Sequence, residues 1–330
     1  MHSNALVEHS KPNQSSKCLL KYLVISCLYF CLFPIALLFN GVAAWVSLHL
    51  RSTSTFIVYL KNLVAADLLM TLTLTPLAAS MLPGASVELR VFTCRYTYVI
   101  FYCCLYTSIT LMGLISLDRF FKIVRPCGKT IGQNVIFSLV TSTSVWVVIF
   151  ALPNTLHNRL VANMTKISTC MALKGPIGLE IHSRIVIYLN VFFWLVSVVI
   201  AICYICIANK VIQSFRTSGS SNNQGQKKIK LRVFLVVVVF FVSFGPYHII
   251  RIPYTVQQVK NSSFMVCSFL SSRFAKEASL LLATTNICMV PLLYVFLCRE
   301  FKEKLVSMMK EVSVFFKDVK AGGITSQSGF

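Results

Sequence analysis

A set of cationic and aromatic residues in the last third of the chain has the spacing needed to bind an anion. Tyr247, Arg251 and Tyr254 follow one another at i, i+4 and i+7, so they share one helix face, with His248 one step round. An arginine fork holds a phosphate through two hydrogen bonds, and Lys276 further along adds a point charge. Tyrosine rings offer faces for a purine. These residue types favour an aromatic ligand that carries phosphate.

Helices that cross a membrane must position these residues. The 330 residues are 56% hydrophobic and only 12% charged, with a mean hydropathy of +0.74, which is too apolar for a soluble protein. The apolar residues fall in blocks that can cross about 30 Å of hydrocarbon, where only a helix satisfies an isolated segment's backbone. The stretch 233–242 is apolar all round, which argues against buried helices of a soluble enzyme. The blocks are 23–48, 56–82, 93–123, 135–156, 185–207, 233–256 and 270–297.

The predicted fold is therefore an all-α bundle of seven transmembrane helices. An extracellular tail over residues 1–21 precedes a membrane domain over 22–298, and a cytoplasmic segment over 299–330 follows it. That last segment is predicted to open with a short amphipathic helix on the inner leaflet, with Cys298 as a candidate for palmitoylation.

Glycosylation sequons at Asn13, Asn163 and Asn261 fall on one side of the seven crossings, which predicts a plasma-membrane protein with its N-terminus outside. No cleavable signal pattern precedes the first block, so that helix is expected to act as an uncleaved anchor. The net charge is +21, and the inner segments carry the larger share of Lys and Arg, as the positive-inside rule requires. Insertion does not explain the positive surplus outside, so we associate that surplus with function.

Four of the 13 cysteines lie on the outer side, where oxidising conditions favour disulfides. They are Cys18, Cys94, Cys170 and Cys267. Four cysteines allow three pairings, and the sequence does not choose among them.

The polar residues inside the apolar blocks form a pattern that resembles the pattern in the rhodopsin-like G-protein-coupled receptors. The resemblance covers about residues 20–310, and no single member of the set is decisive by itself. The set, in chain order, is Asn40, Asp67, Cys94, Asp118-Arg119-Phe120, Trp146, Tyr204, Phe244 with Pro246, Asn286, and Pro291 with Tyr294.

The outer ends of blocks six and seven, over 246–255, 275–277 and 283–289, are similar to the metabotropic (P-two-Y) purinoceptors, in the ADP-recognising branch. The sequence departs from that branch at Val186, where one member has Asn. An alternative role for Lys276 is a structural ion pair with the adjacent Glu277. The ligand-contact positions implied by the resemblance are Tyr102, Lys174, His182, His248, Arg251, Tyr254 and Lys276, to which the aromatic reading adds Tyr106 and Tyr247.

The same resemblance implies two inner sites. Asn40, Asp67, Ser108 and Asn286 match a sodium pocket, although Val290 stands where the family has an Asn or Asp, so sodium binding is expected to be weak. At the cytoplasmic end, Asp118 is expected to hold Arg119 until activation. The residues implied in G-protein coupling are Asp118, Arg119, Phe120, Tyr204 and Tyr294.

We therefore expect a receptor for an extracellular nucleotide, ADP, that acts through a heterotrimeric Gi-type G protein, with membrane lipids as further partners. A receptor for a UDP-sugar or a lysophospholipid, or an orphan receptor with basal activity, is the alternative. An enzyme is not expected, because the chain lacks the common catalytic motifs, and neither a metal nor a tightly bound cofactor is implied. Seven unlike helices do not fit a transporter built from inverted repeats, and the membrane location of the charge excludes nucleic acid.

Overall fold

The structure is a computed structural model, and helices make up its regular elements throughout the part of the chain that it describes. Within that part, six helices are long and apolar enough to cross a membrane, and a shorter apolar helix spans Val135–Phe150. The described residues are 12–50, 54–124, 134–151, 170, 176–217, 223–260 and 267–325.

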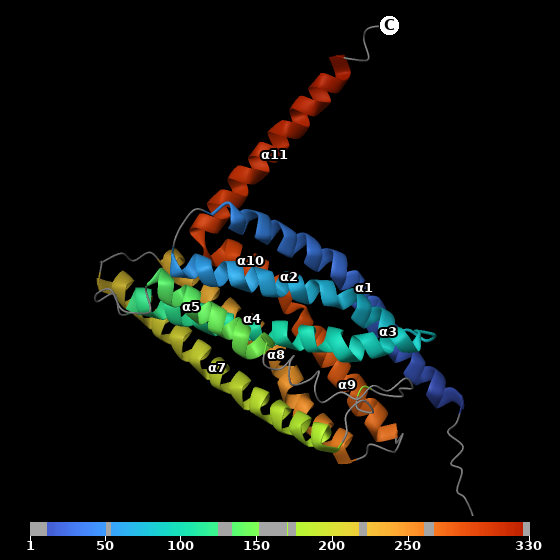
Figure 1. The fold of residues 1–330 in the computed structure, drawn as a ribbon. Helices are drawn as coiled ribbons and strands as arrows, with labels where there is room; N and C mark the ends of the chain where they lie inside the picture. Colours follow the sequence, from blue (N-terminus) through green and yellow to red (C-terminus); the bar gives the residue numbers. More distant parts are fainter. Residues whose placement is uncertain are drawn as a thin grey trace, which may run out of the picture.

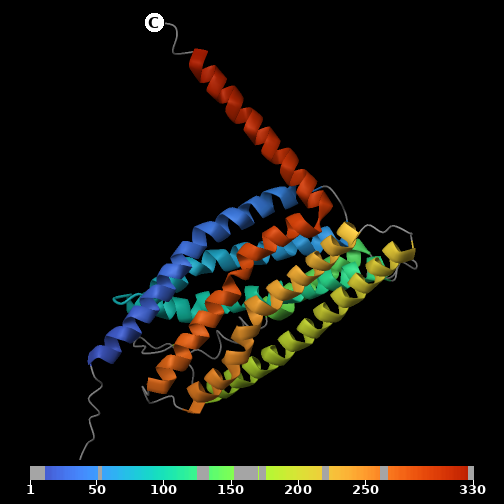
Figure 2. The ribbon, with the colours of Figure 1, turned by 180° about the vertical axis from the view of Figure 1, so that it is seen from behind.

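The membrane helices form one bundle in which sequence neighbours are mostly spatial neighbours (Figures 1 and 2). Helix α1 contacts α2, α2 contacts α4, α4 contacts α7, α7 contacts α8 and α8 contacts α9, while α9 and α10 return to α1. This order confirms the predicted bundle. The elements are α1 (Pro12–Leu48), α2 (Thr55–Met81), α3 (Val87–Phe92), a π-helical turn (Thr93–Thr97), α4 (Tyr98–Val124), α5 (Val135–Trp146) with a π-helical turn (Val147–Ala151), α7 (Pro176–Thr217), α8 (Asn223–Lys260), α9 (Cys267–Thr284) and α10 (Asn286–Leu297).

Several helices extend beyond the apolar blocks that predict them. The third span begins at Val87, before the block over 93–123, because the Ser86 side chain accepts the Leu89 N–H at 3.2 Å and caps the helix. Helix α1 begins at Pro12, so part of the tail predicted over residues 1–21 is helical. Hydrophobicity locates the part of a helix that lies in lipid, whereas caps decide where its hydrogen-bond ladder ends.

The last span is two helices rather than the single one predicted over 270–297, with Thr285 between α9 and α10. Inside α10, Pro291 has no N–H, so the carbonyl of Ile287 loses its usual helical donor. The side-chain amide of Asn40 in α1 donates to this carbonyl at 2.9 Å. A buried asparagine thus satisfies the break and ties α1 to α10.

The helix after the bundle, α11, is longer than the short one predicted, because it spans Arg299–Thr325 and extends away from the other helices (Figures 1 and 2). Neither glycine nor proline occurs in it before Gly322, so nothing in the intervening sequence ends the helix. Phe301 and Met308 are buried against the bundle, whereas Met309 is exposed.

One close helix contact depends on a glycine. Gly113 in α4 faces Val196 in α7, and a Cβ added to Gly113 would lie 3.0 Å from the Val196 Cγ1 atom. Real Cβ atoms seldom come this close to a neighbour, so the missing side chain lets the two helices approach.

Gly113→Val is expected to lower the thermal unfolding temperature of the purified receptor, at a cost of about 1–3 kcal/mol, because the added methyl groups overpack this contact. Val196→Ala in the same chain is expected to recover part of the loss. Gly41→Ala is the control, because a Cβ there meets nothing within 4 Å. An unchanged unfolding temperature for Gly113→Val would contradict the close contact.

Candidate functional site

A buried arginine surrounded by tyrosine rings forms the centre of the outer half of the bundle. The guanidinium carbon of Arg251 in α8 lies 4.9 Å from the ring centre of Tyr102, 5.9 Å from Tyr106 and 5.3 Å from Tyr247. Its Nη1 atom donates to the Tyr106 hydroxyl at 2.8 Å. Helical spacing brings them together: Tyr102 and Tyr106 are one turn apart on α4, as Tyr247 and Arg251 are on α8.

Arg251 is only 6% exposed, yet no carboxylate lies within ion-pair distance of it among the described residues. Burying a charge without a counter-charge is costly, and ring faces recover only part of that cost. The Tyr247 hydroxyl is also buried, with no hydrogen-bond partner in the described part of the chain. The arrangement offers a fixed positive charge and a spare hydroxyl, which suits an anionic ligand.

His248 lies next to Tyr106, and both of its ring nitrogens are within hydrogen-bond distance of a partner. Its Nδ1 atom lies 2.9 Å from the Phe244 carbonyl oxygen and its Nε2 atom lies 3.2 Å from the Tyr106 hydroxyl. The ring stacks on Phe193 of α7 with centres 3.6 Å apart, and His248 is fully buried. The sequence predicts His248 as a ligand contact, and in the structure its side chain contacts Tyr106, Phe244 and Phe193.

The second predicted cation, Lys276 in α9, is already paired. Its Nζ atom lies 2.9 Å from the Glu277 Oε1 atom, and the two side chains are 11% and 6% exposed. The ammonium also lies 5.7 Å from the ring centre of Tyr98 and 6.0 Å from that of Tyr254. The ion pair that the sequence left open as an alternative is therefore present. The Glu277 Oε2 atom is buried with no partner among the described residues.

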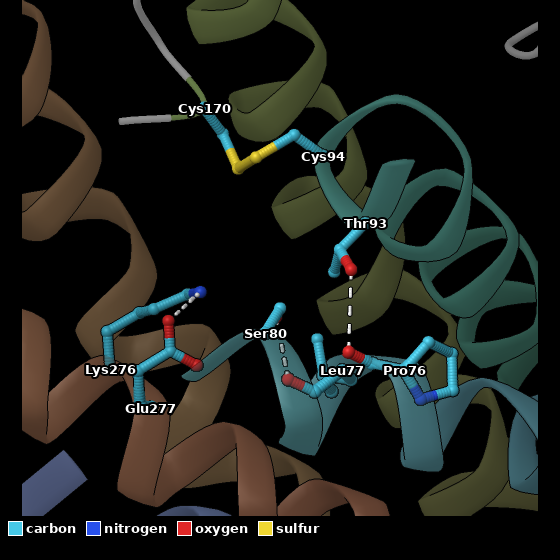
Figure 3. The surroundings of a disulfide bond; sticks show 8 residues. All are labelled: Pro76, Leu77, Ser80, Thr93, Cys94, Cys170, Lys276 and Glu277. Atoms are coloured by element: carbon cyan, nitrogen blue, oxygen red, sulfur yellow. Dashed lines mark hydrogen bonds and ion pairs between the residues drawn. A yellow bond between two sulfur atoms is a disulfide. The ribbon is translucent and has the colours of Figure 1, made fainter. Parts of the chain in front are cut away.

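A disulfide at the outer end joins Cys94, in the π-helical turn before α4, to Cys170, with 5.3 Å between the Cα atoms. Figure 3 shows this disulfide together with the Lys276–Glu277 ion pair. Beside Cys94, the Thr93 hydroxyl donates to the Pro76 carbonyl of α2 at 3.4 Å. The structure thereby assigns the Cys94–Cys170 disulfide, which the sequence left open, whereas the side chains of Cys18 and Cys267 lie outside its described part.

Several predicted outer residues fall outside the described part of the chain. These are Lys174, Asn163 and Asn261, and the side chains of Asn13, Cys18 and Cys267. His182 lies in α7 and is partly buried.

Deep in the bundle, the predicted sodium pocket contains buried oxygen atoms. The Ser108 hydroxyl donates to the Asp67 Oδ1 atom at 2.8 Å. The Asp67 Oδ2, Asn40 Oδ1 and Asn286 Oδ1 atoms are buried without a partner among the described residues. Carboxylate and amide oxygens suit a hard cation such as sodium. Val290 is also buried here and supplies no oxygen, so the donor set fits the ion only in part.

At the end of α4 opposite the disulfide, Asp118 pairs with Lys122, a cation that the sequence analysis does not assign to it. Its Oδ2 atom lies 2.8 Å from Lys122 Nζ, and its Oδ1 atom accepts the hydroxyl proton of Thr55 at the start of α2. The guanidinium carbon of Arg119 lies 4.6 Å from the Phe56 ring centre. The spacing of Asp118 and Lys122, one helical turn apart, was a signal in the sequence that could have found this pair.

The remaining predicted coupling residues are at the same end. Phe120 packs edge-on against Phe121, with ring centres 5.5 Å apart. Tyr204 and Tyr294 come from α7 and α10 and line one small apolar cavity of about 40 Å³, together with Asn286. The structure thus brings the two tyrosines together from opposite parts of the sequence.

Two residues of α7 near the site were missed by the sequence reading. Phe193 stacks on His248, and the side-chain amide of Asn190 donates to the His248 backbone carbonyl. Their partner is on another helix, so no spacing within one segment could reveal them.

Comparison with known proteins gives consistent matches over most of the chain. Residues 39–294 match the family described as 7 transmembrane receptor (rhodopsin family). The chain is 42% identical to the P-two-Y purinoceptor 13 of Homo sapiens over 303 residues, which cover 90% of this chain and 85% of that relative. It is 38% identical to the P-two-Y purinoceptor 14 of Bos taurus, covering 88% and 86% of the two chains. It is 35% identical to G-protein coupled receptor 87 of Mus musculus, covering 86% and 79%.

Sodium is expected to stabilise the purified protein only weakly, and Val290→Asp is expected to strengthen the effect by adding a carboxylate one helical turn from Asn286. If the dissociation constant for sodium lies tenfold below the salt concentration, sodium adds about 1.4 kcal/mol to the free energy of unfolding. Thermal unfolding in sodium chloride and in choline chloride at equal ionic strength measures the difference. Val290→Leu is the apolar control. A wild-type response as large as that of Val290→Asp would contradict the role given to position 290.

Proposed function

Because the chain belongs to the rhodopsin family of seven-transmembrane G-protein-coupled receptors, within its P-two-Y purinoceptor group, we propose that it is the receptor for an extracellular nucleotide, ADP. We further propose that it resides in the plasma membrane with its N-terminus outside and lowers cyclic AMP through a Gi-type G protein. Members of this family are receptors, not enzymes.

The observation that carries the ligand proposal is the buried Arg251 guanidinium that lacks a carboxylate partner among the described residues. A phosphate would supply the counter-charge, and it would enter a site with little water, where the attraction is strong. The unpartnered Tyr247 hydroxyl beside it offers a further hydrogen bond. Lys276 would contribute a second positive charge from the neighbouring helix α9.

The proposal of a purine base draws on the tyrosine rings and on the relatives. Tyr102 and Tyr254 present aromatic side chains near the two cations. Relatives at 42% and 38% identity are named purinoceptors. The sequence at residues 54–62 and 173–179 is similar to purinoceptor thirteen of that group, and we take this resemblance as support for ADP among the nucleotides.

We infer that ligand binding shifts a population of two states. Phosphate held between Arg251 and Lys276 would draw the outer ends of α8 and α9 together. The inner ends would separate in response, and Tyr204 and Tyr294 would rearrange about the small apolar cavity between them. Arg119 would then receive the G protein. Only a ligand with different affinity for the two states produces such a shift.

The test of the ligand is a titration of cells that express the chain with ADP, UDP, UDP-glucose and lysophosphatidylserine while cyclic AMP is measured. Arg251→Gln is expected to raise the ADP concentration for half-maximal response by about tenfold or more, since a hydrogen bond to a charged group contributes about 1.5–3 kcal/mol.

The matched control is Arg184→Gln, which removes the same charge from an exposed ion pair with Glu180. A flat ADP response, with UDP-glucose or the lysophospholipid active instead, would replace the ligand assignment. Equal curves for Arg251→Gln and the wild type would remove Arg251 from the site.

Glu277→Gln is expected to lower the half-maximal ADP concentration by about threefold to tenfold. The amide keeps the shape of the side chain but frees the Lys276 ammonium from its carboxylate and removes a charge that repels phosphate. Lys276→Gln, with cyclic AMP measured in the same way, is the opposing control and should raise that concentration. A weaker ADP response in Glu277→Gln would mean that Glu277 orients Lys276 rather than competes with the ligand.

A further inference from the structure

We propose that Tyr106 and His248 are positioning residues that hold Arg251 through a directed chain of hydrogen bonds, and that His248 does not contact the ligand. This proposal depends on the proposed function in one respect, namely that Arg251 binds the phosphate of the ligand. The chain of bonds itself is a property of the ligand-free protein.

The direction of each hydrogen bond follows from what each atom can donate. The Phe244 carbonyl oxygen only accepts, so His248 Nδ1 carries the proton between them. A second proton on Nε2 would place another positive charge beside Arg251 and leave the Tyr106 hydroxyl without its acceptor, so we assign the neutral imidazole. Its Nε2 atom is then an acceptor and takes the hydroxyl proton of Tyr106 at 3.2 Å. The Tyr106 oxygen in turn accepts the Nη1 proton of Arg251 at 2.8 Å. Each donor in this series of three hydrogen bonds therefore has one acceptor.

Helix α7 keeps the histidine in this position. The Phe193 ring lies on the imidazole at an interplanar angle of 8°, and both residues are fully buried. The Asn190 amide donates to the His248 carbonyl, which fixes the backbone of α8 at the same residue. With both nitrogens engaged and one face covered, the imidazole has no group left to offer a ligand.

The consequence for Arg251 is a fixed orientation without a fixed counter-charge. Among the described residues, Tyr106 is the acceptor of the guanidinium, through Nη1. The rings of Tyr102 and Tyr247 lie 4.9 Å and 5.3 Å from its carbon atom. One hydrogen bond and these ring faces therefore set the orientation of the guanidinium. A carboxylate in the place of Tyr106 would neutralise the charge that a phosphate needs, whereas a hydroxyl backed by a neutral histidine orients it and leaves it positive.

A double-mutant cycle on the full-length receptor at the cell surface tests the chain of bonds. Tyr106→Phe keeps the ring and removes the hydroxyl, and His248→Asn removes the Nε2 acceptor. Each is expected to raise the half-maximal ADP concentration by about tenfold. The double variant is expected to be no worse than the more damaging single variant, because both changes break the same chain. If the fold-increase in the double variant equals the product of the two single increases, the two residues act independently and the proposal is overturned.

Two controls separate positioning from simple damage. Tyr106→Phe combined with Lys276→Gln should show multiplied losses, since Lys276 lies on a different helix with its own partner. His248→Gln, whose amide oxygen reaches the Nε2 position, should recover most of the ADP response that His248→Asn loses. Failure of this rescue would also overturn the proposal. If His248→Asn does not reach the surface, Phe193→Leu, which removes the stacked ring, replaces it in the cycle.

A second readout does not depend on the ligand. If ADP gives no response in the wild type, the proposed function fails, and the same cycle is measured as thermal unfolding of the purified ligand-free receptor. Losses of unfolding temperature that do not add would support the chain of bonds. Losses that add would overturn it, whatever the ligand proves to be.

Discussion

Every polar group inside this bundle must find its partner within the protein, because hydrocarbon supplies no water, and the rest of the structure follows from that constraint. It makes each apolar segment a helix. It also explains why Asn40 reaches across to the Ile287 carbonyl that Pro291 leaves without a donor. The same rule gives Asp67 the Ser108 hydroxyl and gives Arg251 the Tyr106 hydroxyl. Several buried polar residues therefore connect helices.

The groups that do not satisfy this rule lie along the interior of the bundle. The Tyr247 hydroxyl is near the outer end, Asp67 Oδ2 and Asn286 Oδ1 are central, and the Tyr294 hydroxyl is toward the inner end, all without partners among the described residues. Unsatisfied buried groups cost free energy and persist where a ligand, an ion or a second conformation uses them. These four atoms belong to α2, α8 and α10.

The positive charge of the chain is divided between the inner and outer segments, and a buried cation among these charges also needs a partner within the protein. The inner surplus accompanies membrane insertion, and two of the outer cations are paired locally. Arg184 pairs with Glu180 at the surface and Lys276 pairs with Glu277 in the bundle. Arg251 differs from both, because aromatic rings and a hydroxyl surround it in place of a carboxylate. What distinguishes the site is one buried charge with no carboxylate partner among the described residues, rather than the total of +21.

The sequence by itself determined the number of spans, the family and the residues that share a helix face, such as Tyr247 and Arg251. Only the tertiary structure decided that Cys94 joins Cys170, that Lys276 is paired, and that His248 turns toward Tyr106. The reason is physical. Positions along one helix follow from its 3.6-residue period, whereas contacts between helices depend on their rotation and kinks. In lipid an all-round apolar surface leaves that rotation open, and buried polar contacts between helices set it.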